Sequence, residues 1–374
     1  MIYLASHGYS PLDLGLLEML FHVAKFVTEV PTGIFADMLG RRKSLVIYCA
    51  LSALEVLLFL KPTLPLMILS FALSGTAFAF LGGASEAMLW KIAGHAEPAN
   101  QAGRYSRLVS RMYLVGMLGE MLGSSAGGYL NSLLIVLPFI LTSVLALLGI
   151  IPLFFLPEQK VAASERTSAW RHLGTSFRAV WCSPALVGLL LISGLTTSCW
   201  QTIYFFYQLY LNNQGLSVVA VGLIVAASTA ANFLFTATTP YVMRWLKERW
   251  LVPLFVVSEL VGLALMSLPS LWLGLLGYLV FFQASVAVLS PAISTYVNQR
   301  SPEAQRATVL SLQTGLFSAA MIVLFPLFGL GVTNIPYSTA YLWTLYALAA
   351  GALGTLALVL FLQKTRHAPY EEDK

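Results

Sequence analysis

Apolar stretches of about 20 residues alternate with short polar segments along the whole chain. A stretch of this length crosses the apolar core of a bilayer as a helix, because only helices and closed barrels satisfy all their backbone groups there. The pattern therefore predicts an all-α integral membrane protein with eleven transmembrane helices. The stretches cover 12–32, 44–60, 64–90, 107–130, 133–156, 185–211, 217–241, 250–268, 270–297, 307–331 and 337–362.

The composition agrees with a membrane protein, since 58% of the residues are hydrophobic and 10% are charged, whereas soluble proteins carry about 25% charged residues. The net charge of +5 does not indicate nucleic-acid binding, because 19 of the 21 Lys and Arg residues fall in one set of alternate loops. The opposite set holds only Lys61. Basic loops stay in the cytoplasm. We therefore expect a multi-pass protein of the inner (cytoplasmic) membrane, with a cytoplasmic C-terminus and Met1 outside.

An internal repeat becomes visible when the chain is shifted by 207 residues. The shift places Gly8, Ser10 and Gly15 on Gly215, Ser217 and Gly222. Two halves built from one repeat are typical of secondary transporters. The span 185–211 precedes Gly215, and its counterpart would lie before residue 1, so we expect a twelve-helix protein without its first helix. Two explanations stay open: a start codon assigned too late, or a genuine eleven-helix form.

A polar segment at 157–184 separates the two halves. Its apolar residues recur at spacings of three and four, which predicts an amphipathic helix at the cytoplasmic interface. We expect an N-terminal helical bundle over 1–156, a linker over 157–184, and a C-terminal bundle with a short cytoplasmic tail over 185–374. The three cysteines form no pair motif, so neither a disulfide framework nor a metal site is expected.

The turn between the first two spans carries the most informative motif. Residues 29–44 read Glu-Val-Pro-Thr-Gly-Ile-Phe-Ala-Asp-Met-Leu-Gly-Arg-Arg-Lys-Ser. The string resembles the signature loop of the major facilitator superfamily, and its Glu-x-Pro-Thr-Gly beginning is similar to that of a bacterial branch with multidrug and tetracycline exporters. The resemblance implies two pseudo-symmetric helical bundles that work by alternating access. It also implies a gating motif made of Glu29, Gly33, Asp37, Gly40, Arg41 and Arg42.

A run of glycines lies on the 107–130 span. Spacing by four places Gly119, Gly123 and Gly127 on one helix face, where another backbone can approach closely, and Gly128 follows directly. The string from Gly123 to Gly128 resembles the superfamily's antiporter motif Gly-Pro-x-x-Gly-Gly, with Ser124 in place of the proline. The motif favours an exporter, while plain helix packing is the alternative.

Ionisable side chains inside membrane spans are costly, so they tend to face protein or water and to mark function. Glu18, His22, Lys25 and Glu29 follow one helical stripe, and Glu55, Glu86, Glu120 and Glu259 lie in other spans. One interpretation is that the stripe forms two neutral i,i+4 pairs that lock helices together. The other is proton coupling by Glu18, His22 and Glu86, because carboxyl and imidazole groups can exchange protons near neutral pH.

Neutral polar and aromatic residues gather on two later spans. The 185–211 span carries Ser193, Thr197, Trp200, Gln201 and Tyr204 at helical spacing, and the 270–297 span carries Gln283. Such side chains fit the wall of a substrate cavity for a moderately lipophilic compound. The alternative is that they only tie helices together, at about 0.6 kcal/mol each.

The chain has no nucleotide-binding loop of the Gly-Lys-Ser type and no catalytic constellation, so we do not expect an enzyme or a cofactor. The expected energy source is a proton gradient, and the expected partners are a small-molecule substrate and the lipid bilayer, without nucleic acid. We expect a monomer that carries out proton-coupled export of a small, partly lipophilic solute. The alternatives are uptake of a sugar-like or other metabolite, and a transport-inactive truncated protein.

Overall fold

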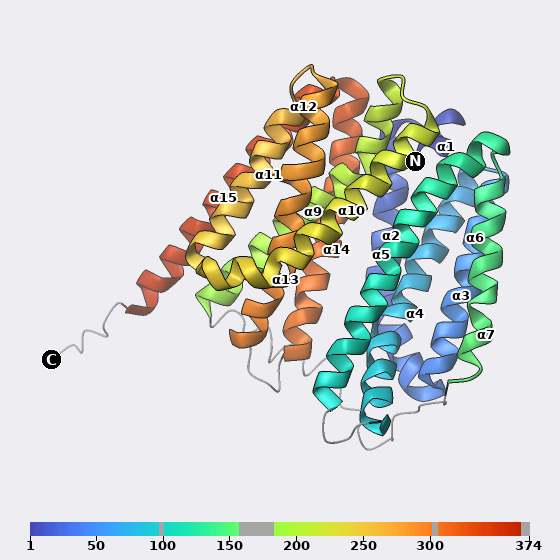
Figure 1. Cartoon of the computed structure of the whole chain (residues 1–374), viewed down its shortest axis with the longest axis horizontal. Helices are drawn as coiled ribbons and strands as arrows, with labels where there is room; N and C mark the ends of the chain where they lie inside the picture. Colours follow the sequence, from blue (N-terminus) through green and yellow to red (C-terminus); the bar gives the residue numbers. More distant parts are fainter. Residues whose placement is uncertain (97–100, 157–182, 301–305, 368–374) are drawn as a thin grey trace. The chain divides into compact units, whose positions relative to one another are not determined.

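The structure is a computed structural model that describes residues 1–96, 101–156, 183–300 and 306–367, and within these ranges the regular secondary structure is helical throughout (Figure 1). The first half contains α1 (Ile2–Ser6), α2 (Pro11–Leu39), α3 (Arg41–Leu57) with the 3₁₀ turn η1 (Leu58–Leu60), α4 (Leu64–Ala96), α5 (Gln101–Leu133), α6 (Leu137–Leu148) and α7 (Ile150–Leu153). The second half contains α9 (Pro184–Asn213), α10 (Val218–Trp245), α11 (Glu248–Met266), α12 (Leu271–Leu276), η4 (Gly277–Phe282), α13 (Gln283–Arg300), α14 (Arg306–Asn334) and α15 (Tyr337–His367).

Each of the eleven predicted spans falls on one of these helices or on a directly continuous group of them. Among the described residues, eight helices are long and apolar enough to cross a membrane. The other three predicted spans differ for physical reasons. Helix α2 carries the charged stripe, α5 carries the glycine run and several charged residues, and the apolar stretch Leu137–Leu153 is shorter than the rest.

The turn geometry supports the 207-residue repeat. Gly8 and Gly215, which the shift aligns, have φ values of +89° and +85°. A residue with a Cβ rarely adopts this conformation, so glycine is needed at both turns. Two residues later, the side chains of Ser10 and Ser217 each accept a hydrogen bond from the backbone N–H three residues further on, at 3.2 Å in both cases. The last turn of α9 and the short helix α1 are therefore followed by the same capped entry into the next helix.

The described helices belong to two compact units. Unit 1 comprises Met1–Thr167, Phe206–Thr229 and Phe325–Leu330, and unit 2 comprises Ser168–Phe205, Ala230–Leu324 and Gly331–Lys374. In unit 2, a core of buried apolar side chains joins α9, α11 and α13 around Leu190, Leu251 and Ile293. The predicted division into bundles at 156 and 185 stays a prediction, and the predicted amphipathic linker helix lies outside the described residues.

In unit 2, the chain passes from α12 into α13 through a π-helical segment, η4. A π turn interrupts the regular α-helical hydrogen bonding and is frequent at functional sites. Neighbouring α11 packs closely against it, because a Cβ on Gly277 would lie 2.6 Å from the Gly262 carbonyl oxygen. Ser258 of α11 also donates a hydrogen bond of 2.8 Å to the Phe281 carbonyl inside the π segment. The disturbed backbone thus receives a donor from the adjacent helix.

A second break in the same helix is caused by Pro291 in α13. Proline has no N–H, so it cannot donate to the carbonyl four residues earlier, which belongs to Ala287. The hydroxyls of Thr236 and Thr239 on α10 donate to that carbonyl instead, at 3.3 and 3.4 Å. The segment between the two breaks begins with Gln283, and helices α10 and α11 stabilise its two ends.

Candidate functional site

Gln283 joins three helices of unit 2, and its side chain is 1% exposed. Its Oε1 accepts hydrogen bonds from Trp200 Nε1 on α9 at 3.1 Å and from Asn232 Nδ2 on α10 at 3.3 Å. An indole N–H can only donate, so Trp200 determines which amide atom of Gln283 faces it. Gln283 Nε2 is therefore directed away from this pair, and it is buried without a hydrogen-bond partner among the described residues.

Aromatic rings lie directly beside this amide. Trp200 and Tyr204 stack on α9 with their ring centroids 5.3 Å apart and an angle of 24° between the planes. Both rings are partly exposed, as are Thr197 and Gln201 on the same helix. The structure thus brings Trp200 and Gln283 into direct contact and stacks Tyr204 on Trp200. All of these side chains are electrically neutral.

The predicted cavity residue Ser193 has a different environment. It is buried, and its hydroxyl accepts a hydrogen bond of 2.6 Å from Gln313 Nε2 on α14. This bond ties α9 to α14, which agrees with the helix-tying alternative at this position.

Asn232 was not selected as a site residue from the sequence, although it takes part in the Gln283 network. Thr236, one turn later on α10, contacts Asn232 Oδ1 at 3.5 Å. The available signal was Asn232 itself, the one amide side chain in the 217–241 span, with Thr236 four residues later. From here on, the polar cluster means Trp200, Tyr204, Asn232 and Gln283.

A buried carboxyl group, Glu259 on α11, lies elsewhere in unit 2. Its side chain is 0% exposed, and Oε2 accepts a hydrogen bond of 3.0 Å from Ser285 on α13. The thiol of Cys199 also faces this carboxyl group. No described Lys or Arg lies within ion-pair distance of it, so Ser285 and Cys199 supply its polar surroundings.

In unit 1, the proposed proton carriers Glu18 and His22 lie on α2, and both are buried. The His22 ring stacks on Phe325 of α14 with a centroid distance of 5.8 Å. Glu18 is close enough to Glu55 on α3 for the two carboxyl groups to interact electrostatically. Glu55 in turn accepts a hydrogen bond of 3.2 Å from Ser70 on α4. The third candidate, Glu86, lies on α4, and its side chain is outside the described parts of the structure.

The predicted gating motif occupies the junction of α2 and α3. Gly40 ends α2 with φ +112°, a value that favours glycine, and its N–H donates to the Ala36 carbonyl at 3.1 Å. Arg42 Nη1 donates to the Leu156 carbonyl at 3.3 Å and so connects the start of α3 to the segment after α7. Asp37 lies within α2, and its side chain is outside the described parts.

The other motif residues lie on either side of this turn. Gly33 is exposed and would accept a Cβ without contact, Glu29 is exposed, and Arg41 is partly exposed. Lys25 and Glu29 do not come within ion-pair distance, so the second neutral pair of the alternative interpretation does not form in this structure.

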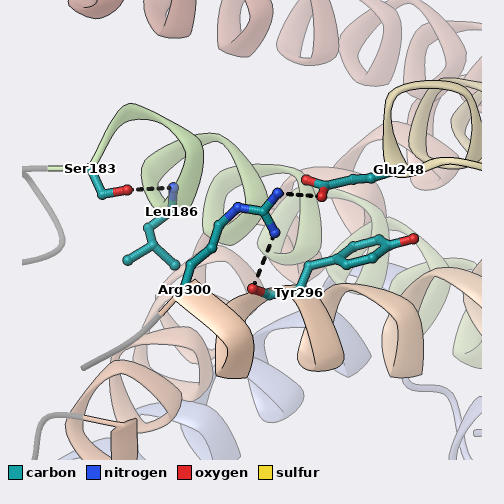
Figure 2. A network of polar contacts seen from close by, with 5 residues as sticks. All are labelled: Ser183, Leu186, Glu248, Tyr296 and Arg300. Atoms are coloured by element: carbon teal, nitrogen blue, oxygen red, sulfur yellow. Dashed lines mark hydrogen bonds and ion pairs between the residues drawn. The ribbon is translucent and has the colours of Figure 1, made fainter. Parts of the chain in front are cut away.

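The 207-residue shift places the Arg41-Arg42 pair on Glu248-Arg249, at the junction of α10 and α11. Figure 2 shows that Arg300, the last residue of α13, forms an ion pair there with Glu248. Arg300 also donates a hydrogen bond of 3.3 Å to the Tyr296 carbonyl, and its guanidinium lies 5.8 Å from the centre of the Tyr296 ring. The second half therefore uses an ion pair between two helix ends at the position that corresponds to the motif.

The glycine prediction for α5 needs correction. A Cβ on Gly119, Gly123 or Gly127 would meet no described atom within 4 Å, so the predicted packing face does not form at these three positions. The fourth predicted packing residue, Gly128, does make a close approach, because a Cβ there would lie 2.9 Å from the Val218 carbonyl oxygen of α10. On α10, a Cβ on Gly222 would lie 2.6 Å from the Ser124 carbonyl oxygen. Gly128 directly follows Gly127, so the close contact lies about 100° around the helix from the predicted face.

Comparisons with known proteins all identify similarity to membrane transporters. The family model described as Major Facilitator Superfamily matches residues 1–261. The chain is 24% identical over 339 residues to a protein of Bacillus subtilis (strain 168) described as an uncharacterized MFS-type transporter, YxaM, covering 88% of this chain and 83% of that protein. It is 24% identical over 160 residues to Multidrug resistance protein 2 of the same strain, covering 42% of this chain and 38% of that protein. The crystal structure of the nucleoside transporter NupG has a similar fold, with a TM-score of 0.72, 14% identity, and coverage of 94% of this chain and 91% of NupG.

Proposed function

The chain belongs to the major facilitator superfamily, and on that premise we propose that it exports a small, partly lipophilic solute in exchange for protons by alternating access. The chain is a multi-pass membrane transporter and not an enzyme. To membership of this transporter family, the proposal adds the direction of transport, the kind of solute and the coupling ion.

The observation that carries the proposal is the polar cluster on α9, α10 and α13. It combines two stacked aromatic rings with two amide groups and contains no charged side chain. Sites for small organic molecules are mostly apolar and aromatic, with a few polar groups that determine orientation. This composition suits a neutral ring-containing solute better than a phosphate or another polyanion.

Two further observations support export. The string from Gly123 to Gly128 resembles the antiporter motif of the superfamily, apart from Ser124. The chain also matches part of a relative whose name is Multidrug resistance protein 2.

For proton coupling we propose Glu18, His22 and Glu86. Glu18 and His22 are buried on one helix and lie one turn apart, where water is scarce and a bound proton changes the local charge strongly. Glu86 is included because it lies on α4, the helix that lines the cavity in the superfamily. A transporter uses such groups by binding a proton in one conformation and releasing it in the other.

We propose a cytoplasmic C-terminus and cytoplasmic basic loops in the inner membrane, because 19 of the 21 Lys and Arg residues lie on one set of loops. The test uses a variant without its native cysteines and a membrane-impermeant maleimide on intact cells. Lys61→Cys should be labelled at once, and Lys247→Cys only after the membrane is permeabilised; both positions are exposed. The reverse labelling pattern would contradict the orientation.

The test of the site compares two tryptophan variants in reconstituted liposomes with a panel of neutral and charged aromatic solutes. Trp200→Phe keeps an aromatic ring but removes the N–H that bonds to Gln283. Trp272→Phe, at a residue that is 80% exposed, is the matched control. We expect transport of neutral solutes to fall about tenfold for Trp200→Phe, which corresponds to one lost hydrogen bond, and to stay unchanged for the control. Equal transport by both variants would refute the role of the cluster.

A further inference from the structure

Gln283 combines an ordered acceptor with an unused donor. Its Oε1 has two partners, while Nε2 is buried without a partner among the described residues. Most buried polar groups in proteins are hydrogen-bonded, so an exception requires an explanation. The amide cannot satisfy Nε2 by rotating, because Trp200 would then face an NH₂ group with its own N–H.

Leaving a buried donor unpaired has a free-energy cost, which a ligand with an acceptor atom can remove on binding. A ligand of the same shape without that acceptor would leave the cost in place. Binding sites built around such a polar group discriminate strongly between the two kinds of molecule.

We propose that Gln283 is a specificity-determining residue that selects solutes carrying a carbonyl or ether oxygen on a planar, uncharged ring system. The oxygen accepts a hydrogen bond from Gln283 Nε2, and the ring lies against the stacked Trp200 and Tyr204. This inference rests on the proposed function, because it names the class of solute that the polar cluster takes.

The position of Gln283 along its helix explains how a buried donor becomes reachable. It is the first residue after the π segment η4, and the Pro291 break lies two turns later. Helices bend at π turns and at prolines, so the segment between the two breaks can move while its ends stay bonded to Ser258 and to Thr236. Trp200 and Asn232, which cover the amide, are both partly exposed. A modest movement of this segment would therefore bring Nε2, which is directed away from Trp200 and Asn232 in this structure, within reach of a solute on the aromatic pair.

The experiment measures equilibrium binding to the purified full chain, using two probes that differ in one group. Fluorenone has a ring carbonyl, and fluorene has a CH₂ group in its place. We expect the wild-type protein to bind fluorenone at least about tenfold more tightly than fluorene, the ratio that one well-made hydrogen bond provides.

The variant Gln283→Glu keeps an oxygen facing Trp200 and Asn232 but replaces the unused N–H donor. Measured at a pH high enough to ionise the new carboxyl group, which then has no donor, it should reduce the fluorenone-to-fluorene ratio to about one, mainly by weakening fluorenone binding. Gln299→Glu, at an exposed position on the same helix, is the control and should keep the wild-type ratio. Gln283→Met is the second variant, because it is uncharged and unbranched, and it should give the same loss of ratio if Gln283→Glu does not fold.

The inference is overturned if the wild-type protein binds both probes equally, if it binds neither, or if a folded Gln283 variant keeps the ratio. Binding is measured without transport, so the two proposals fail separately. A protein that selects fluorenone but moves no solute would refute export and leave the role of Gln283 intact.

Discussion

The Ala287 carbonyl provides a quantitative test of how α13 is held together. Thr236→Val and Thr239→Val each remove one hydroxyl that donates to this carbonyl, at 3.3 and 3.4 Å. Valine has nearly the shape of threonine, so the main change is the lost donor. Because Pro291 supplies no N–H, the double variant leaves the carbonyl without a donor.

The expected magnitude follows from two kinds of hydrogen-bond loss. A side-chain hydrogen bond between membrane helices contributes about 0.6 kcal/mol on average. A buried polar group that loses its last partner costs about 1–3 kcal/mol. Each single variant should therefore lower the free energy of unfolding by about 0.6 kcal/mol. The double variant should lower it by about 2 kcal/mol, which exceeds the sum of the single changes.

The assay is equilibrium unfolding of the purified protein in mixed micelles of mild and denaturing detergent. Thr238→Val is the matched control, because Thr238 is exposed and bonds within its own helix to the Phe235 carbonyl. A second background with Pro291→Ala restores the backbone N–H that α-helical geometry directs at Ala287. In that background the double Thr→Val change should cost no more than about 0.5 kcal/mol, since the carbonyl has regained a donor. Equal costs in both backgrounds would refute the reasoning.

Three further predictions concern unit 1. Gly222→Ala should destabilise the protein by about 1–3 kcal/mol, because its Cβ would lie 2.6 Å from a backbone oxygen. Gly123→Ala should be neutral or stabilising in the same equilibrium-unfolding assay, and equal losses of stability in the two glycine variants would contradict this. Glu18→Gln or Glu86→Gln should abolish proton-driven accumulation of solute but leave its downhill exchange, because a glutamine side chain cannot bind and release a proton. Uphill transport with normal pH dependence in both variants would show that neither residue carries the proton. Asp37→Asn should slow transport far more than it weakens solute binding, as measured by comparing initial rates with Kd, and wild-type turnover would exclude a role in gating.

The helices and their order could be predicted from the sequence because membrane spans have a strong, local signal. The repeat was also visible, since Gly8 and Gly215 are both required at turns with positive φ. The turn at Gly40, within the predicted gating motif, also has a positive φ. At these three turns the backbone has a positive φ, which favours glycine, so the residue type itself predicts the turn.

The arrangement of the candidate site was harder to predict from the sequence than the helices were. Helical spacing places residues on a face but does not say what lies opposite that face. For this reason four glycines were expected to pack, but Gly119, Gly123 and Gly127 lie open and Gly128 makes the close contact. Asn232 was missed because its role depends on how α10 is rotated toward Gln283. The π segment η4 has no sequence signature within its apolar run, so the break before Gln283 could not be anticipated.

The most direct test of the central claim is a proton-flux measurement in liposomes that contain the purified protein and a trapped pH indicator. The solute is the panel compound that binds most tightly and does not leak through protein-free liposomes. We predict that an imposed solute gradient drives protons in the opposite direction, and that Trp200→Phe reduces this flux about tenfold while Trp272→Phe leaves it unchanged. Solute movement without proton movement, or proton movement in the same direction as the solute, would contradict proton-coupled export.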